Sequence, residues 1–263
     1  MLVAFCGILF CDYVFDSDVG LGLSGIFTGG IGLLEFYNIV EKKGFVPFKV
    51  SGIIGGVIVF LGFWLSAYED GLNPIFPCIF VLIILWLFGV QALKRGTDDT
   101  IKNISVTVFG IIYIYFFLSF IMPIRHMSNG LGIILLVLLV TKGGDIGGYL
   151  FGRKFGRHKF SSFSPNKTIE GALFGLFCSL IIAIGLNALP GISILPFYII
   201  VPFGLLIGAS GIFGDLIESV IKRDMTVKDS SSAIPAFGGI LDILDSLLIS
   251  IPVAYYFLVI IGY

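Results

Sequence analysis

Acidic and basic side chains gather in one polar stretch near the end of an otherwise apolar chain. Asp215, Glu218 and Lys222 recur at helical spacing. Asp242 and Asp245 follow, three residues apart. Residues three or four apart share one face of a helix, so the carboxylates converge if the two segments pack as neighbours. Carboxylate oxygens without histidine or thiolate are the ligands that a hard cation such as Mg²⁺ prefers.

Basic residues flank the same stretch. Lys222 and Arg223 end its first segment, and Lys228 lies in the connection that follows. Ammonium and guanidinium groups bind phosphate oxygens, so the whole pattern predicts a site for a metal-bound polyphosphate. Interhelical salt bridges would explain any single pair. Six or more such groups between residues 215 and 245 favour a site.

A second polar stretch lies just before another apolar run. Ser164, Lys167 and Thr168 place hydroxyl and ammonium donors ahead of a helix start, where free N–H groups also favour anions. A simple N-cap explains part of this pattern, with Thr168 or Asn166 capping and Glu170 in the first turn.

Lys142 and Asp145 lie three residues apart inside an apolar run. Charged groups at membrane depth are costly, so they pair, face a cavity or hold an ion. For this pair alone, a buried ion pair and a role in the site are equally compatible with the sequence.

The elements that must position these groups are membrane-spanning helices. Of the 263 residues, 57% are hydrophobic and 13% are charged, whereas soluble domains carry roughly a quarter charged residues. This composition excludes a soluble globular protein and predicts an all-α, polytopic integral membrane protein with about nine transmembrane helices. The predicted spans are about 1–12, 19–41, 50–67, 73–93, 100–122, 130–151, 168–188, 193–223 and 238–262. The first is the shortest.

The basic residues indicate the orientation. Of the 16 Lys and Arg residues, 14 fall in the loops that follow the second, fourth, sixth and eighth spans. The positive-inside rule places these loops, the N-terminus and the site in the cytoplasm. We expect the membrane to be a prokaryotic cytoplasmic (inner) membrane. The net charge of −1 gives no field for nucleic acid, so no nucleic-acid partner is expected.

The chain divides into two regions by its chemistry. Residues 1–130 are plain spans, a scaffold with possible dimer contacts, in which Glu35 is the only clear ionisable residue at membrane depth. Residues 131–263 hold the predicted catalytic region. Glycines spaced four apart, such as Gly144 and Gly148 or Gly171 and Gly175, predict close packing of helices there.

The polar stretches resemble two motifs of the phosphatidate cytidylyltransferase (CDP-diacylglycerol synthase) family. The first motif comprises Ser219, Lys222, Arg223, Lys228, Asp229, Ile234, Pro235, Gly238, Gly239, Asp242 and Asp245. The second comprises Asp145, Gly147, Gly148, Tyr149, Gly152, Arg153, Gly156, Arg157, His158, Lys159, Ser164, Pro165, Lys167, Thr168, Glu170 and Gly171. Two positions depart from the family pattern: Phe237 stands where histidine is common, and Ile243 where arginine is common.

The resemblance implies that CTP and phosphatidate react to CDP-diacylglycerol and diphosphate in phospholipid biosynthesis, with a divalent metal and a homodimer. We expect Asp215 and Asp242 to hold Mg²⁺, with Asp245 as a ligand or in contact with one. A second cation beside it is compatible with this prediction.

The remaining predicted roles concern phosphate binding. Lys222, Arg223 and Lys228 would bind the diphosphate. Ser164, Lys167 and Thr168 would meet the phosphatidate head group or a nucleotide phosphate, oriented by Asp145 and Glu170. Ser219 and Asp229 complete the predicted substrate-binding set.

A cation- or proton-coupled transporter is the alternative, because buried Asp, Glu and Lys residues also mark ion pathways. A CDP-alcohol phosphotransferase is disfavoured, because its Asp-Gly-x₂-Ala-Arg run is missing.

Overall fold

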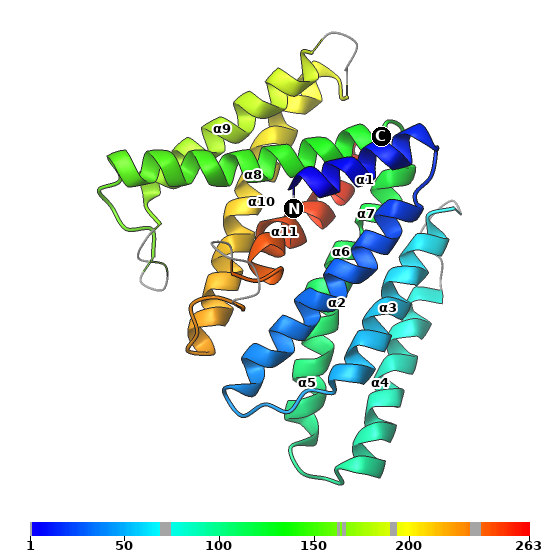
Figure 1. Ribbon diagram of the computed structural model, residues 1–263. Helices are drawn as coiled ribbons and strands as arrows, with labels where there is room; N and C mark the ends of the chain where they lie inside the picture. Colours follow the sequence, from blue (N-terminus) through cyan, green and yellow to red (C-terminus); the bar gives the residue numbers. More distant parts are fainter. Residues whose placement is uncertain (1, 69–74, 162–163, 165–166, 190–193, 232–237) are drawn as a thin grey trace. The chain divides into compact units, whose positions relative to one another are not determined.

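The computed structural model describes residues 2–68, 75–161, 164, 167–189, 194–231 and 238–263. Among these, every regular element is a helix (Figure 1). Asn166, the other candidate N-cap, and Ile234, Pro235 and Phe237 of the first motif lie outside the described residues.

Eight helical segments among the described residues are long and apolar enough to cross a membrane, which confirms a polytopic helical membrane protein. Seven are the single helices α2 (Val19–Glu41), α3 (Lys49–Ser66), α4 (Ile75–Lys94), α8 (Gly130–Phe155), α9 (Ile169–Asn187), α10 (Phe197–Asp224) and α11 (Leu241–Ile260). The eighth runs from Thr100 to His126 through α5 (Thr100–Gly110), a π-helical segment (Ile111–Phe116), α6 (Phe117–Ser119) and α7 (Ile121–His126).

The first predicted span is a shorter helix, α1 (Leu2–Val14). Its 13 residues extend about 20 Å at 1.5 Å per residue, less than the hydrocarbon core of about 30 Å. The side of the membrane on which the N-terminus lies stays a prediction.

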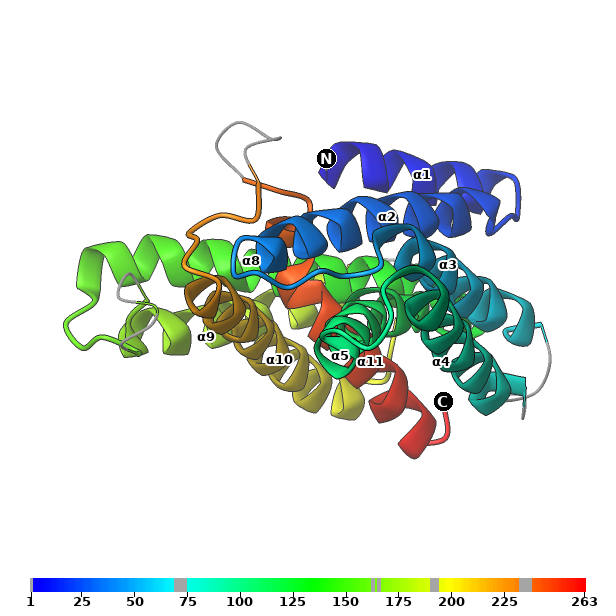
Figure 2. The ribbon, with the colours of Figure 1, turned by 90° about the horizontal axis from the view of Figure 1, so that it is seen from below.

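The chain forms two compact units, of which the first contains residues 1–126 and 225–242. Its helices pack aromatic rings against glycines: the Tyr115 ring lies where a Cβ of Gly56 would be, and the Tyr37 ring lies against Gly52. The Tyr115 hydroxyl donates to the carbonyl of Ile26 at 2.9 Å. These contacts hold α2 and α3 beside the π-helical segment, and Figure 2 shows α3, α4 and α5 gathered within this unit.

One buried carboxylate joins three segments of this unit. Asp18, just before α2, accepts hydrogen bonds from Trp64 Nε1 at 2.8 Å, from the Tyr68 hydroxyl at 2.8 Å and from His126 Nε2 at 3.1 Å. Burial alone would raise the pKa of Asp18, but the hydrogen bonds from Tyr68, His126 and Trp64 hold it below its usual value.

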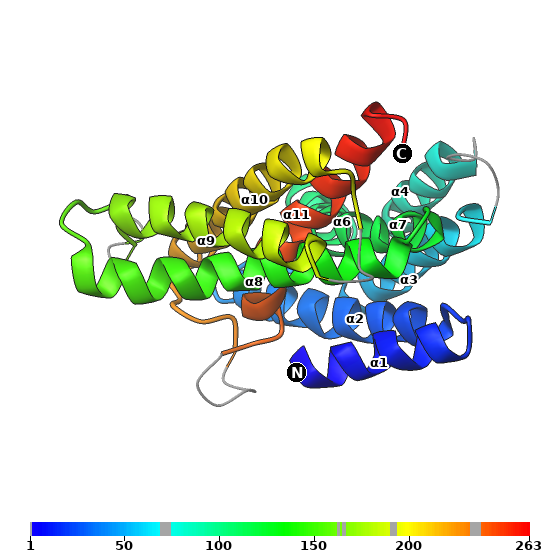
Figure 3. The same ribbon diagram turned by 90° about the horizontal axis from the view of Figure 1, so that it is seen from above.

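The second unit contains residues 127–224 and 243–263. Here α8 and α9 run side by side (Figure 3). A Cβ atom on Gly148 would lie 3.0 Å from the carbonyl oxygen of Gly171, and one on Gly175 would lie 2.9 Å from that of Gly144. The glycines spaced four apart therefore bring the two backbones together, as the sequence predicted.

Candidate functional site

Three carboxylates converge in the second unit. Asp215 and Glu218 lie on α10 and Asp245 on α11, and one oxygen from each lies within 4.8 Å of the others. Gly214 permits the approach, because a Cβ atom there would lie 2.6 Å from the carbonyl oxygen of Asp245. The Glu218 side chain is 1% exposed and that of Asp245 9%, whereas that of Asp215 is 34% exposed. The group is therefore buried on two sides and reachable at Asp215.

Two lysines pair with carboxylates of this group. Lys167, just ahead of α9, places its ammonium 2.5 Å from Asp215 Oδ2. Lys222, one turn after Glu218 on α10, lies 2.7 Å from Glu218 Oε2. Two residues that the sequence assigned to phosphate binding therefore contact the acidic group directly.

Lys142 on α8 joins the same group from a third direction. Its ammonium lies 3.5 Å from Asp245 Oδ1 and 3.4 Å from Asp145 Oδ2, and it donates to the Ser246 hydroxyl at 2.6 Å. Ser246 in turn donates to Asp145 at 3.0 Å. The pair of Lys142 and Asp145 therefore contacts the acidic group through Asp245 and Ser246 and is more than an isolated ion pair within α8.

The donor set suits a hard divalent cation. Four carboxylates, those of Asp145, Asp215, Glu218 and Asp245, face the three ammonium groups, which leaves one net negative charge. Like charges packed this closely repel one another unless cations compensate them. Oxygen ligands without nitrogen or sulfur fit Mg²⁺.

Thr168 caps α9, as the sequence predicted: its side-chain oxygen accepts from the Gly171 N–H at 3.1 Å. Glu170 binds the preceding basic loop. It accepts from the Arg157 N–H at 3.1 Å and lies 2.6 Å from His158 Nδ1. Ser164, which was assigned to phosphate binding, is buried. Thr168 and Glu170, whose residue types suggested anion binding, therefore cap α9 and bind the loop before it.

Asp242 lies at the start of α11, where the first unit ends. Its Oδ2 accepts from the Ser230 N–H at 2.9 Å, from the Ser230 hydroxyl at 2.6 Å and from the Gly239 N–H at 2.7 Å. Lys228 and Asp229 directly precede Ser230 and are exposed. The role of Asp242 as a metal ligand stays a prediction.

The other two predicted residues lie on α10. Ser219 is half-buried beside Glu218, and Arg223 is exposed one residue after Lys222. Both remain candidates for substrate contact.

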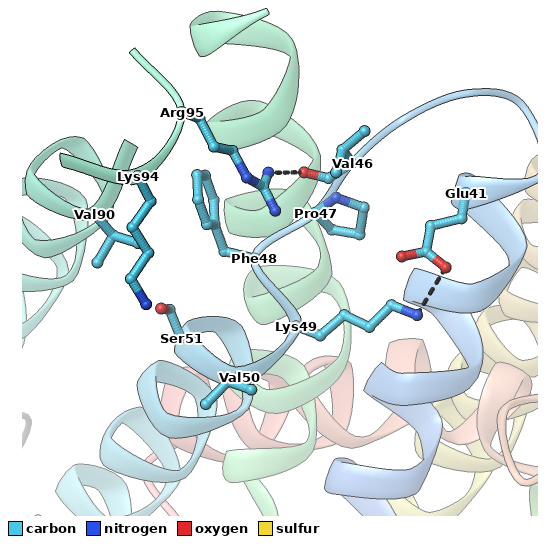
Figure 4. A pocket seen from close by; sticks show the side chains of 10 residues that line it. All are labelled: Glu41, Val46, Pro47, Phe48, Lys49, Val50, Ser51, Val90, Lys94 and Arg95. Carbon is cyan, nitrogen blue, oxygen red and sulfur yellow. Dashed lines mark hydrogen bonds and ion pairs between the residues drawn. The ribbon is translucent and has the colours of Figure 1, made fainter. Parts of the chain in front are cut away.

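A pocket of about 390 Å³ in the first unit is lined by other residues (Figure 4). It lies between the end of α2, the start of α3 and the end of α4, and none of the predicted site residues lines it. The Arg95 guanidinium stacks 4.0 Å from the centre of the Phe48 ring, while Lys49 pairs with Glu41 at 2.7 Å.

Sequence reasoning gave no role to three residues that the structure places at the polar groups. In the sequence, Glu218 stands out only by its spacing, and Lys142 only by its pairing with Asp145. Ser246 adjoins Asp245 and carried no signal beyond that adjacency. Repeated i, i+3 and i+4 spacing was the available signal for Glu218, whereas the contacts of Lys142 and Ser246 depend on how different helices meet.

Comparison with known proteins identifies the family. The profile described as "Cytidylyltransferase family" matches residues 2–261. The phosphatidate cytidylyltransferase of Chlamydia pneumoniae is 34% identical over 259 residues, covering 93% of this chain and 84% of its own length. That of Staphylococcus aureus (strain COL) is 38% identical over 247 residues, covering 86% and 90%. That of Bacillus subtilis (strain 168) is 29% identical over 234 residues, covering 87% and 86%. The chain belongs to the cytidylyltransferase family.

Proposed function

We propose that this chain is an integral-membrane CTP:phosphatidate cytidylyltransferase, which transfers CMP from CTP to phosphatidate to give CDP-diacylglycerol and diphosphate. Membership of the family supports the reaction. The main observation in support of this site is the convergence of Asp215, Glu218 and Asp245, whose negative charges are compensated by lysines. Membership of an enzyme family favours this reaction over the transporter that the buried charges alone would allow.

The reaction needs charge neutralisation more than a strong base. A phosphate monoester has a second pKa near about 6, so the attacking oxygen of phosphatidate is largely anionic at neutral pH. This oxygen forms a bond to the α-phosphorus of CTP while the bond from that phosphorus to the bridging β-oxygen breaks. The electron pair leaves with diphosphate. A site that aligns two polyanions and compensates their charge is therefore sufficient, as in phosphoryl transfer generally.

We assign the roles by position. Asp215, Glu218 and Asp245 would hold Mg²⁺, with Asp242 as the further carboxylate that the sequence predicts one turn earlier on α11. When bound, the ion would neutralise the triphosphate and the departing diphosphate. Lys142 and Asp145 fix the Asp245 side of the group.

The basic residues would bind phosphate. Lys167 already contacts Asp215, so a phosphate that it binds would lie next to the metal ligands. Ser164 and Thr168 flank Lys167 and are proposed for the same head-group or nucleotide phosphate. Lys222 contacts Glu218 and, with Arg223, is proposed for the diphosphate.

The connection after α10, together with Ser219 on α10, supplies the rest of the proposed substrate contacts. Lys228 would bind the diphosphate with Lys222 and Arg223, and Asp229 and Ser219 complete the set. We propose that the site faces the cytoplasm, because the positive-inside rule puts the basic loops on that side. The bacterial relatives support a prokaryotic inner membrane as its location. The homodimer rests on the family resemblance.

The test is formation of CDP-diacylglycerol by the purified protein in detergent, from CTP and phosphatidate, with and without Mg²⁺. Asp245→Asn should lower the rate by more than about 100-fold, beyond what changes outside the first ligand shell usually cost. Asp98→Asn is the matched control, because Asp98 is exposed in the turn after α4. Turnover without any divalent cation, or a wild-type rate for Asp245→Asn, would refute the assignment of the site.

A further inference from the structure

Glu35 is a buried carboxylate that the residues assigned above leave unexplained. It lies in the apolar helix α2 and is 6% exposed. An ionisable group at this depth is costly unless hydrogen bonds or charges compensate it. Its partners therefore indicate what it does.

Among the described residues, its hydrogen-bond donors lie in the segment after α10 and at the start of α11. Oε1 accepts from the Ser231 hydroxyl at 2.8 Å and from the Ile240 N–H at 3.1 Å. Oε2 accepts from the Leu241 N–H at 2.8 Å and from the Ser230 hydroxyl at 3.3 Å. One carboxylate thus binds the chain at residues 230–231 and again at residues 240–241. These contacts lie within the first unit.

Two of these donors are backbone N–H groups at the start of α11. The first N–H groups of a helix have no partner within it, and a negative charge at that end is favourable. Glu35 therefore acts as a cap supplied by a residue about two hundred positions earlier in the chain. It fixes where α11 begins.

The same contacts reach Asp242. The Ser230 hydroxyl lies 2.6 Å from Asp242 Oδ2 and 3.3 Å from Glu35 Oε2, between the two carboxylates. Gly239 lies against this group so closely that a Cβ atom would overlap the Ser230 hydroxyl and Glu35 Oε2. Gly238 has a φ of +86°, and a Cβ there would lie 2.5 Å from Asp242 Oδ2. The Gly-Gly pair thus gives the two carboxylates access to the backbone.

We propose that Glu35 is a positioning residue for CMP transfer: it holds residues 230–231 and 240–241 so that Asp242 is presented at a fixed place on the first turn of α11. The inference rests on the proposed function for its effect on catalysis. The hydrogen bonds stand independently of that function. Glu35 itself touches neither substrate nor metal in this scheme.

Glu35→Gln is the main test. The amide keeps the volume but turns one acceptor into a donor, which then faces N–H and O–H donors. Changes in groups that orient metal ligands typically cost 10–100-fold in affinity or activity. We therefore expect turnover to fall about 10- to 100-fold and the Mg²⁺ concentration for half-maximal rate to rise. Ser231→Ala, which removes one donor, should shift both quantities in the same direction by less.

Glu41→Gln is the matched control on the same helix. Glu41 is exposed and pairs with Lys49, so the rate and the Mg²⁺ dependence should stay at wild-type values. Size-exclusion profiles of all variants identify any that fail to fold. If Glu35→Gln fails to fold, the comparison of Ser231→Ala with the wild type still tests the inference.

Hydrogen exchange of the backbone amides in residues 238–242 tests the positioning without the reaction. Exchange should be faster in Glu35→Gln than in the wild type or Glu41→Gln. A wild-type Mg²⁺ dependence together with wild-type exchange in Glu35→Gln would overturn the inference while leaving the proposed function intact. A wild-type protein that makes no CDP-diacylglycerol would instead refute the proposed function, and exchange would still decide whether Glu35 holds the segment.

Discussion

Gly171 lies in the close contact between α9 and α8, and an alanine there tests whether this contact supports the site. A Cβ atom on Gly171 would lie 2.8 Å from the carbonyl oxygen of Gly148 and 3.0 Å from the Cα atom of Gly152. Both neighbours are backbone atoms, which cannot rotate away as the end of a side chain could. The two helices must therefore separate to accept Gly171→Ala.

The expected cost follows from this overlap. Adding a methyl group to a tightly packed contact costs about 1–3 kcal/mol. Replacing glycine within a helix returns up to about 1 kcal/mol, and less in the first turn, where Gly171 lies. A net loss of about 1–2 kcal/mol corresponds to a Tm lower by about 2–8 °C for a chain of this size. The transferase rate should also fall, because Lys167 and Thr168 directly precede this turn.

Thermal unfolding of the purified variants in one detergent measures this effect. Gly185→Ala is the matched control, since Gly185 lies on the same helix and a Cβ atom there would meet nothing within 4 Å. Its Tm should equal or slightly exceed that of the wild type. If Gly171→Ala unfolds at the wild-type temperature, or Gly185→Ala loses as much, then close packing of α8 and α9 is not what the glycines provide.

Substitutions at three further residues test other parts of the structure. Asp18→Asn should lower the Tm at neutral pH. Because the pKa of Asp18 is lower in the folded protein than in the unfolded chain, the ionised carboxylate stabilises the fold above the unfolded pKa of about 3.9, and this stabilisation is lost as the pH falls through the folded pKa. The difference in Tm between Asp18→Asn and the wild type should therefore disappear in acid. Thr168→Ala should lower the Tm by about 2–4 °C, because an N-cap is worth about 1 kcal/mol, and Thr168→Ser should restore it. Lys142→Met should lower both the Tm and the rate, because it leaves the charges of Asp145 and Asp245 without this ammonium. Added Mg²⁺ should raise the Tm of Lys142→Met more than that of the wild type, because the ion compensates the same two carboxylates.

Most of the fold could be predicted from the sequence, because the length and hydropathy of an apolar run indicate a membrane span. The spans at 19–41 and 130–151 correspond to α2 and to most of α8. The exception, α1, was already the shortest run. Glycine spacing also predicted close packing of helices in this region, because small residues four apart form a continuous groove on one helix face, but it did not say that α8 and α9 are the two helices that meet.

The sequence predicted the site directly within one helix, and between helices only on the condition that they are neighbours. Spacing along α10 places Asp215, Glu218 and Lys222 on one stripe, and the structure has the ion pair of Glu218 and Lys222. Periodicity does not say which stripes of different helices face one another. The contact of Lys142 with Asp245 joins residues about a hundred positions apart, and no repeat in the sequence connects them.

Glu35 shows that a long-range contact can still be indicated by the residue types in the sequence. A carboxylate in an apolar span must find donors, and in a helical membrane protein the backbone N–H groups left over are those at the starts of other helices. Gly238 and Gly239, just ahead of α11, mark a start at which a carboxylate can approach the backbone. An unpaired intramembrane acid and a Gly-Gly pair before another span are therefore complementary features. In this chain the two features meet where the Leu241 N–H donates to Glu35 Oε2.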